Sequence, residues 1–198
     1  MDNNKTLKGK DLITIGTFSA IYFVINFIFM ILSGLHPIVW ILLPALISLL
    51  SGIPYMLMCT KVQKFGAVLI MGFITGLIYF VTGQFTVIIL VSFLISCLLA
   101  ELVRYLFKYN TFKGNVVSFV LFSLGMVGSP LPVWLIHDSF FNQLKEQGMS
   151  ADYIATLEGF SSTPMLIVLF VAPIICSIIG LFITKAMFNK HFKKAGML

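Results

Sequence analysis

Six apolar runs, each close to 20 residues long, take up most of this chain of 198 residues. A helix needs about 20 apolar residues to cross the roughly 30 Å hydrocarbon core of a bilayer. In hydrocarbon the backbone must satisfy its own hydrogen bonds, and continuous runs without two-residue alternation favour helices over a β-barrel. The sequence therefore predicts an all-α integral membrane protein with a single six-helix domain over residues 1–198. The approximate spans are 12–32, 38–58, 65–81, 85–107, 116–136 and 165–188.

The composition excludes a water-soluble fold. Hydrophobic residues make up 59% of the chain and charged residues only 10%, whereas soluble domains are about half apolar and a quarter charged. A soluble chain of this length has no interior large enough for so much apolar surface. The six spans also leave room for one modest loop and no extramembrane domain.

The positive charges indicate the orientation of the chain. If the N-terminus is cytoplasmic, 12 of the 13 Lys and Arg residues fall on the inner side and only Lys145 falls on the outer side. Such an excess in short cytoplasmic loops is the positive-inside pattern. The sequence therefore predicts that both ends are cytoplasmic, and the net charge of +6 reflects topology and contact with anionic lipid, with no nucleic-acid partner. The inner residues are Lys5, Lys8, Lys10, Lys61, Lys64, Arg104, Lys108, Lys113, Lys185, Lys190, Lys193 and Lys194.

The single long connection, 137–164, lies on the predicted outer side. Between Asp138 and Glu158 it places spaced apolar residues among polar ones, which predicts one or two short amphipathic helices over the membrane surface. It carries four carboxylates against Lys145, so the outer mouth is expected to be mildly acidic.

Polar and aromatic residues gather at the same outer side. Trp and Tyr at this depth are often interfacial belt residues. However, Pro130, Pro132 and Pro173 free backbone carbonyls at membrane depth, which is tolerated where other helices or a water-filled cavity satisfy them. We therefore expect a ligand pocket open to the outside. The candidate substrate-binding residues are His36, Trp40, Tyr79, Gln84, Trp134, His137 and Asp138.

Catalytic and ATPase motifs are not found in the sequence. Glu101 and Arg104 are three positions apart near the inner boundary, and we interpret them as a local ion pair. Cys59, Cys97 and Cys176 have no metal-type spacing and are expected to pack as small apolar residues. We expect no enzyme activity and no cofactor in this chain, so active transport would need ATP hydrolysis by partner subunits.

Small residues four or fewer positions apart allow close helix contact in lipid. Gly16 and Ala20 form such a pair in the first span, Gly72 and Gly76 in the third, and Gly125 and Gly128 lie close together in the fifth. Internal packing is the commoner role of such pairs, and docking of a second protein is the alternative. Asn26, deep in the first span, is expected to form an interhelical hydrogen bond, with pocket lining as the alternative.

These features resemble the S component of energy-coupling factor (ECF) transporters, which are multi-pass proteins of bacterial cell membranes. The opening from Lys8 to Tyr22, KGKDLITIGTFSAIY, is especially similar to the subgroup called Trep_Strep. The resemblance implies that the chain captures a micronutrient outside and topples while docked on a transmembrane coupling protein and two cytoplasmic ATPases. In that family an Ala-x-x-x-Ala face of the first helix contacts the coupling protein. The matching positions are Gly16 and Ala20, where glycine departs from the pattern but keeps the surface flat.

The substrate stays open between two classes. An acidic mouth with aromatic residues suits a neutral or cationic vitamin-like ring. Alternatively, His36 and His137 are the metal ligands if the substrate is haem or another tetrapyrrole, and no other metal site is expected. A membrane structural or assembly factor and an uncharacterised membrane enzyme are the competing functions.

Overall fold

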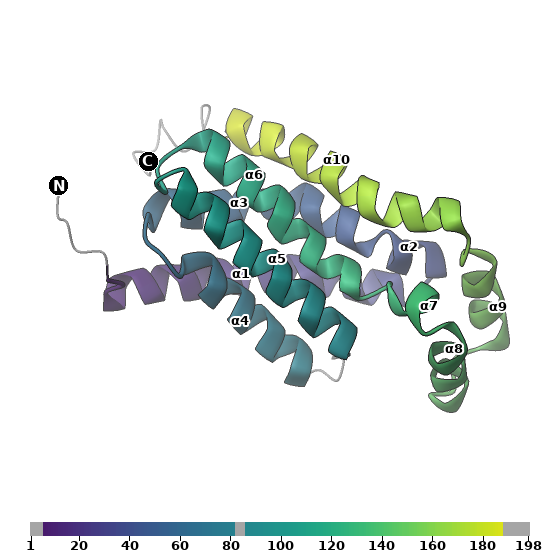
Figure 1. Ribbon diagram of the computed structural model, residues 1–198. Helices are drawn as coiled ribbons and strands as arrows, with labels where there is room; N and C mark the ends of the chain where they lie inside the picture. The colour runs from purple at the N-terminus through teal and green to yellow at the C-terminus, as the bar shows by residue number, and fades with distance from the viewer. Residues whose placement is uncertain (1–5, 82–85, 188–198) are drawn as a thin grey trace.

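The computed structural model describes residues 6–81 and 86–187, and over these residues all regular secondary structure is helical (Figure 1). The prediction of an all-α protein is therefore confirmed. The elements are α1 (Gly9–Ser33), α2 (Pro37–Ile41), α3 (Leu43–Lys61), α4 (Ala67–Val81), α5 (Val87–Leu106), α6 (Phe112–Ser123), the 3₁₀ helix η1 (Leu124–Gly128), α7 (Pro132–Leu135), α8 (His137–Glu146), α9 (Ala151–Gly159) and α10 (Thr163–Met187).

Within the described part of the chain, four helices are long and apolar enough to cross a membrane, namely α1, α3, α5 and α10. Two shorter apolar helices, α4 and the continuous pair α6–η1, lie among them. These six segments match the six predicted runs in position, although only four reach full length by themselves.

The second predicted span, 38–58, is not one helix. It divides into α2 and α3 at Leu42, whose backbone turns to φ −84° and ψ 0°. Pro44 lies in the first turn of α3, where its missing N–H costs nothing, but the same residue disfavours a helix running through from α2. The imidazole of His36 accepts a hydrogen bond from the Ile38 amide (3.2 Å) and caps the start of α2.

The fifth predicted span, 116–136, is also not continuous. Helix α6 tightens into η1 after Ser123 and regular structure resumes only at α7. Gly125 and Gly128 face Phe93, Ser92 and Ile89 of α5 so closely that a side chain at either glycine would overlap them. The tight approach and the following prolines explain why this segment is broken.

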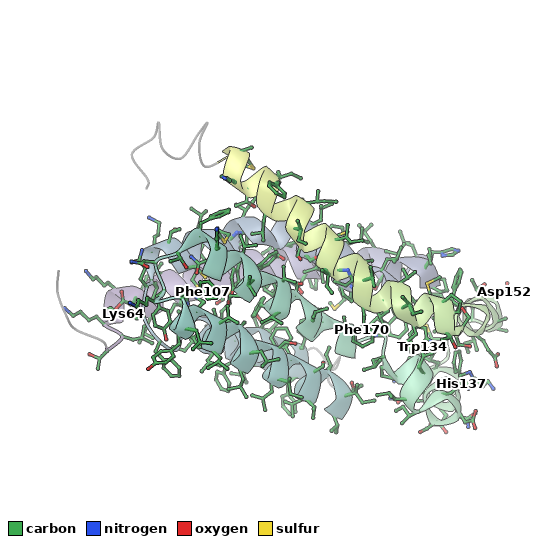
Figure 2. All side chains as sticks on the ribbon, turned by 45° about the horizontal axis from the view of Figure 1, so that its top comes forward. Lys64, Phe107, Trp134, His137, Asp152 and Phe170 are labelled. Atoms are coloured by element: carbon green, nitrogen blue, oxygen red, sulfur yellow. The ribbon has the colours of Figure 1, made fainter. Side chains whose placement is uncertain are left out.

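The long helices alternate in direction between two distinct ends of the molecule (Figure 1). At the basic end, α1 begins, α10 ends, and the α3–α4 and α5–α6 connections lie; Figure 2 shows Lys64 and Phe107 there. At the opposite end, named here the hairpin end, lie α7, α8 and α9 with Trp134, His137 and Asp152 (Figure 2). Among the described residues, Lys145 of α8 is the only Lys or Arg at the hairpin end.

Helix α3 forms the centre of the bundle and packs against α1, α6 and α10. Its closest contact is with α10, where Gly180 lies against the backbone of Leu49 and Gly52 lies 3.2 Å, measured from an ideal Cβ, from the Thr184 hydroxyl. The Ser48 hydroxyl also contacts the Pro173 carbonyl (3.2 Å). Small residues thus let the backbones of α3 and α10 approach closely, as expected in lipid, where van der Waals packing and not the hydrophobic effect drives helix association.

Tyrosine and phenylalanine rings fill the middle of the bundle. The Tyr55 ring lies 5.0 Å from the rings of both Phe119 and Phe122, and its hydroxyl is 2.6 Å from the Ser118 hydroxyl. The polar tip of the tyrosine is therefore satisfied inside the protein. Cys59 and Cys97 are buried as free thiols and Cys176 is half-buried, which confirms packing roles for the first two.

Candidate ligand-binding site

Two amphipathic helices, α8 and α9, form a hairpin, as the spacing of apolar residues in this connection predicts. Gly148 takes φ +77° in the turn between them, a conformation that glycine adopts without strain. The Ser150 hydroxyl then accepts a hydrogen bond from the Tyr153 amide (3.3 Å) and caps α9. Phe141 and Leu144 of α8 are buried with residues of α9, so the apolar faces of the hairpin turn inward.

A second hydrophobic core joins this hairpin to the bundle. Ile41 of α2 and Val133 of α7 are fully buried against it, and both tryptophans pack on its edge. The Trp134 indole N–H donates to the Ser162 carbonyl (3.1 Å). The Trp40 ring stacks on the Phe140 ring, with centroids 5.6 Å apart and planes 4° apart. The hairpin is therefore held by packed aromatic side chains.

A cavity of about 280 Å³ lies between the hairpin and the ends of α1 and α2. The Tyr153 hydroxyl donates to the Ser33 carbonyl (3.3 Å) and ties α9 to the end of α1 beside it. The volume is near the lower end of the range for small-molecule sites, roughly 300–1,000 Å³. The lining residues are Met30, Ser33, Gly34, Trp40, Thr86, Ser129, Phe140, Gln143, Leu144, Gln147, Met149, Tyr153 and Leu157.

The cavity combines aromatic and uncharged hydrogen-bonding groups. None of the described lining residues is Lys, Arg, His, Asp or Glu. Burial raises the pKa of Tyr153 above its ordinary value, so this phenol stays neutral at physiological pH. The Gln143 and Gln147 amides each offer donors and an acceptor. This arrangement suits binding and orienting a small molecule, and it contains no nucleophile paired with a base.

The structure brings only part of the predicted site together. Trp40 lines the cavity, and Trp134 supports the core behind the hairpin. His36 is exposed and does not line the cavity. His137 and Asp138 contact each other (3.0 Å), but the Asp138 side chain is 99% exposed and neither residue lines the cavity. Gln84 lies outside the described residues.

Tyr79 lies elsewhere in the bundle. It is buried, and its hydroxyl donates to the Asn26 side-chain oxygen (3.1 Å), joining α4 to α1. The Asn26 amide nitrogen donates in turn to the Tyr22 carbonyl (2.7 Å). The interhelical role predicted for Asn26 is confirmed, and the structure places Tyr79 in that contact and not in the cavity.

The sequence reading missed the polar lining contributed by α8. Phe140, Gln143, Leu144 and Gln147 recur at three- and four-residue intervals, so they share one helix face. The sequence pattern alone predicts that the apolar residues of this segment lie over the membrane surface. The sequence does place Gln143 and Gln147 on the same helix face as Phe140 and Leu144, and this pattern could have indicated that the face lines a partly polar cavity.

A larger groove, about 560 Å³, lies between α4 and α5 but has a different character. Among its described lining residues, Tyr79 alone has a hydroxyl or other strong hydrogen-bonding side-chain group, and that hydroxyl donates to Asn26. Phe73 and Phe80 on its rim are largely exposed on the apolar surface of the bundle. Lipid fills such a groove in a bilayer, so it is the weaker candidate for binding a polar nutrient.

The ion pair predicted between Glu101 and Arg104 is wrong. Both side chains are buried, yet no N···O contact within 4.0 Å joins them in the described part of the chain. The carboxylate accepts a hydrogen bond from the Val68 amide (2.9 Å) at the start of α4. The guanidinium donates to the Val62 carbonyl (2.8 Å) after α3 and to the Asn115 side chain (3.3 Å) in α6. The two side chains thus bond separately to helix ends, although one carboxylate oxygen of Glu101 and the second terminal nitrogen of Arg104, Nη1, are buried without a hydrogen-bond partner among the described residues.

Gly16 and Ala20 lie on an open face in the half of α1 toward the basic end. Ala20 is exposed, and a Cβ added at Gly16 would meet no atom within 4 Å. Gly72 differs, because a Cβ there would overlap the Cys97 thiol of α5. Internal packing is therefore confirmed for Gly72, as it is for Gly125 and Gly128, while Gly16 and Ala20 stay available for contact with another protein.

Residues 9–194 match the model of a protein family described as "Hypothetical bacterial integral membrane protein (Trep_Strep)". The match covers nearly the whole chain. No curated protein and no solved structure matches it. Among the described residues, no group of three or more His, Cys, Asp and Glu side chains is placed to hold a metal ion.

Proposed function

Because the chain belongs to the Trep_Strep family of bacterial integral membrane proteins, we propose that it is the substrate-binding (S) subunit of an ECF-type importer. The cavity beneath the α8–α9 hairpin carries this proposal, because it is small, uncharged and formed at one end of a membrane bundle. The chain is not an enzyme in this account and holds no cofactor. A coupling protein and two ATPase subunits supply the energy.

The orientation that we propose follows from the charges. The hairpin end faces outside, because Lys145 is its only described cation, and the basic end faces the cytoplasm. The shorter helices α4 and α6–η1 complete six crossings, since they run beside the four full-length helices between the same two ends. The cavity then collects its ligand from the outer side.

The proposed docking surface is the open face of α1. Gly16 and Ala20 present little side-chain volume there, which allows another helix to approach closely in lipid. Their position toward the basic end places this contact in the inner half of the bilayer. Capture and docking thus use different parts of the same bundle.

The proposed substrate is a vitamin-like ring compound. Haem or another tetrapyrrole is the less well supported class, because His36 and His137 do not line the cavity. Aromatic rings and amides in the lining favour a molecule that stacks and forms hydrogen bonds.

Co-purification with the coupling protein and the ATPase pair tests the proposal. We expect wild type to carry all three partners, and Gly16→Leu or Ala20→Leu to lose most of them, because the added side chain separates the helices. Gly76→Leu is the matched control, since a Cβ at Gly76 also meets nothing within 4 Å but lies on α4. Unchanged assembly in both α1 variants overturns the docking surface. A wild-type chain that purifies alone and binds no small molecule supports a structural or assembly factor.

A further inference from the structure

The chemistry of the hairpin cavity defines its ligand more narrowly than the family does. The presence of a ligand rests on the proposed function, whereas the charge of that ligand is inferred from the residues that line the cavity. Every described lining side chain is apolar, aromatic, amide or hydroxyl. Transferring an ionised group into such surroundings without a counter-charge is costly.

None of the charged residues of the α8–α9 hairpin lines the cavity. Lys145 and Glu146 follow Leu144 directly, yet both are exposed and neither lines the cavity. Gln143 and Gln147 occupy the cavity face instead, four positions apart on α8. The carboxylates that the sequence predicts at the outer mouth therefore lie on the hairpin outside the cavity and do not line it.

The remaining lining favours a flat molecule. Trp40 and Phe140 both line the cavity and stack on each other as nearly parallel rings, and this aromatic pair is named here the Trp40–Phe140 wall. Aromatic partners gain most from offset stacking or edge contact with another ring. The amides of Gln143 and Gln147 and the hydroxyls of Thr86 and Ser129 lie around that wall as donors and acceptors.

We infer that the group held in the hairpin cavity is an uncharged, flat ring that carries hydrogen-bond donors and acceptors. Such a group stacks against the Trp40–Phe140 wall while glutamine amides satisfy its polar edge. Compounds that bring a carboxylate, phosphate or ammonium into the cavity are disfavoured, because none of the described lining residues carries an opposite charge.

Two substitutions that introduce a negative or a positive charge at Gln143 test this inference. The full-length protein is immobilised and incubated with the low-molecular-weight fraction of yeast extract, and mass spectrometry identifies the retained compound. Its affinity is then measured for wild type, Gln143→Glu and Gln143→Lys. Gln143 is already exposed on α8, so neither substitution disturbs the core. Asn142→Glu and Asn142→Lys are the matched controls, since Asn142 is exposed beside it but does not line the cavity.

We expect an uncharged ring compound whose affinity falls by about tenfold in both Gln143 variants, as loss of a hydrogen bond between the Gln143 amide and the ligand predicts, and little change in the Asn142 pair. Tighter binding in Gln143→Lys identifies an anionic group, and tighter binding in Gln143→Glu a cationic one; either result overturns the inference. Retention of no compound by wild type also overturns it. Partner co-purification is scored separately, so an S subunit with a charged ligand is distinguishable from a chain that is not an S subunit.

Discussion

Replacing Gly180 by alanine probes the closest helix contact in the bundle. An ideal Cβ at this position overlaps the Leu49 carbonyl oxygen of α3 and lies 2.9 Å from the Leu49 carbonyl carbon and 3.0 Å from the Ser48 carbonyl oxygen. All three are backbone atoms, so no side-chain rotation relieves the overlap and α10 must move away from α3. That movement also stretches the contact between the Ser48 hydroxyl and the Pro173 carbonyl.

The expected cost follows from these contacts. Overpacking a well-filled site costs about 1–3 kcal/mol, and rigid backbone neighbours place Gly180→Ala toward the upper value. The higher helix propensity of alanine returns about 1 kcal/mol, which leaves a net loss of about 1–2 kcal/mol. For a chain of this size each kcal/mol corresponds to roughly 2–4 °C in Tm, so we expect Tm to fall by about 2–8 °C.

In a Cys176→Ser background, which removes the half-buried thiol, a thiol-reactive fluorescent dye measures this unfolding in detergent, because Cys59 and Cys97 are buried free thiols that react only after the bundle opens. Gly76→Ala is the control, since its Cβ meets no atom within 4 Å and the variant should unfold at or above the wild-type temperature. An unchanged Tm for Gly180→Ala would refute the close contact between α3 and α10.

Three further predictions concern the two ends of the bundle. Arg104→Leu leaves buried acceptors such as the Val62 carbonyl without their donor, and we expect a loss of about 1–3 kcal/mol, measured by the same dye assay; a loss below about 0.5 kcal/mol contradicts the burial described. Glu101→Gln keeps an oxygen for the Val68 amide, so it should destabilise less than Glu101→Leu; equal effects would argue against that hydrogen bond. Tyr153→Phe removes the bond from α9 to α1, and we expect faster tryptic cleavage after Lys145, with a rate equal to wild type as the contrary result.

The positions of the long helices could be predicted from the sequence, because only helices and closed barrels satisfy the backbone in hydrocarbon. A continuous apolar run must satisfy its backbone internally, and α1, α5 and α10 accordingly follow the predicted spans within a few residues. Hydropathy is insensitive to helix breaks, however. Leu42 and the segment after Ser123 are as apolar as their neighbours, and the breaks there depend on Pro44 and on glycines pressed against α5.

The candidate site was predictable by region and not by residue. The aromatic and proline residues point to the end of the bundle where the hairpin cavity lies, and Trp40 lines that cavity. His36 and His137 do not line the cavity. A polar residue at the start of a helix can serve as a cap instead, as His36 does for α2. The pairing of Glu101 with Arg104 also failed, since three-residue spacing on a helix permits contact without requiring it, and backbone groups of α3 and α4 hold each charge instead.

In the proposed orientation, the hairpin cavity opens to the outside of the cell. Labelling with a membrane-impermeant maleimide tests this orientation directly in a Cys176→Ser background, with Asn142→Cys on α8 and Lys113→Cys at the basic end, both at exposed positions. We predict that intact cells label Asn142→Cys fully, whereas Lys113→Cys reacts only after the cells are broken. Labelling of Lys113→Cys alone in intact cells would reverse the orientation and contradict capture from outside.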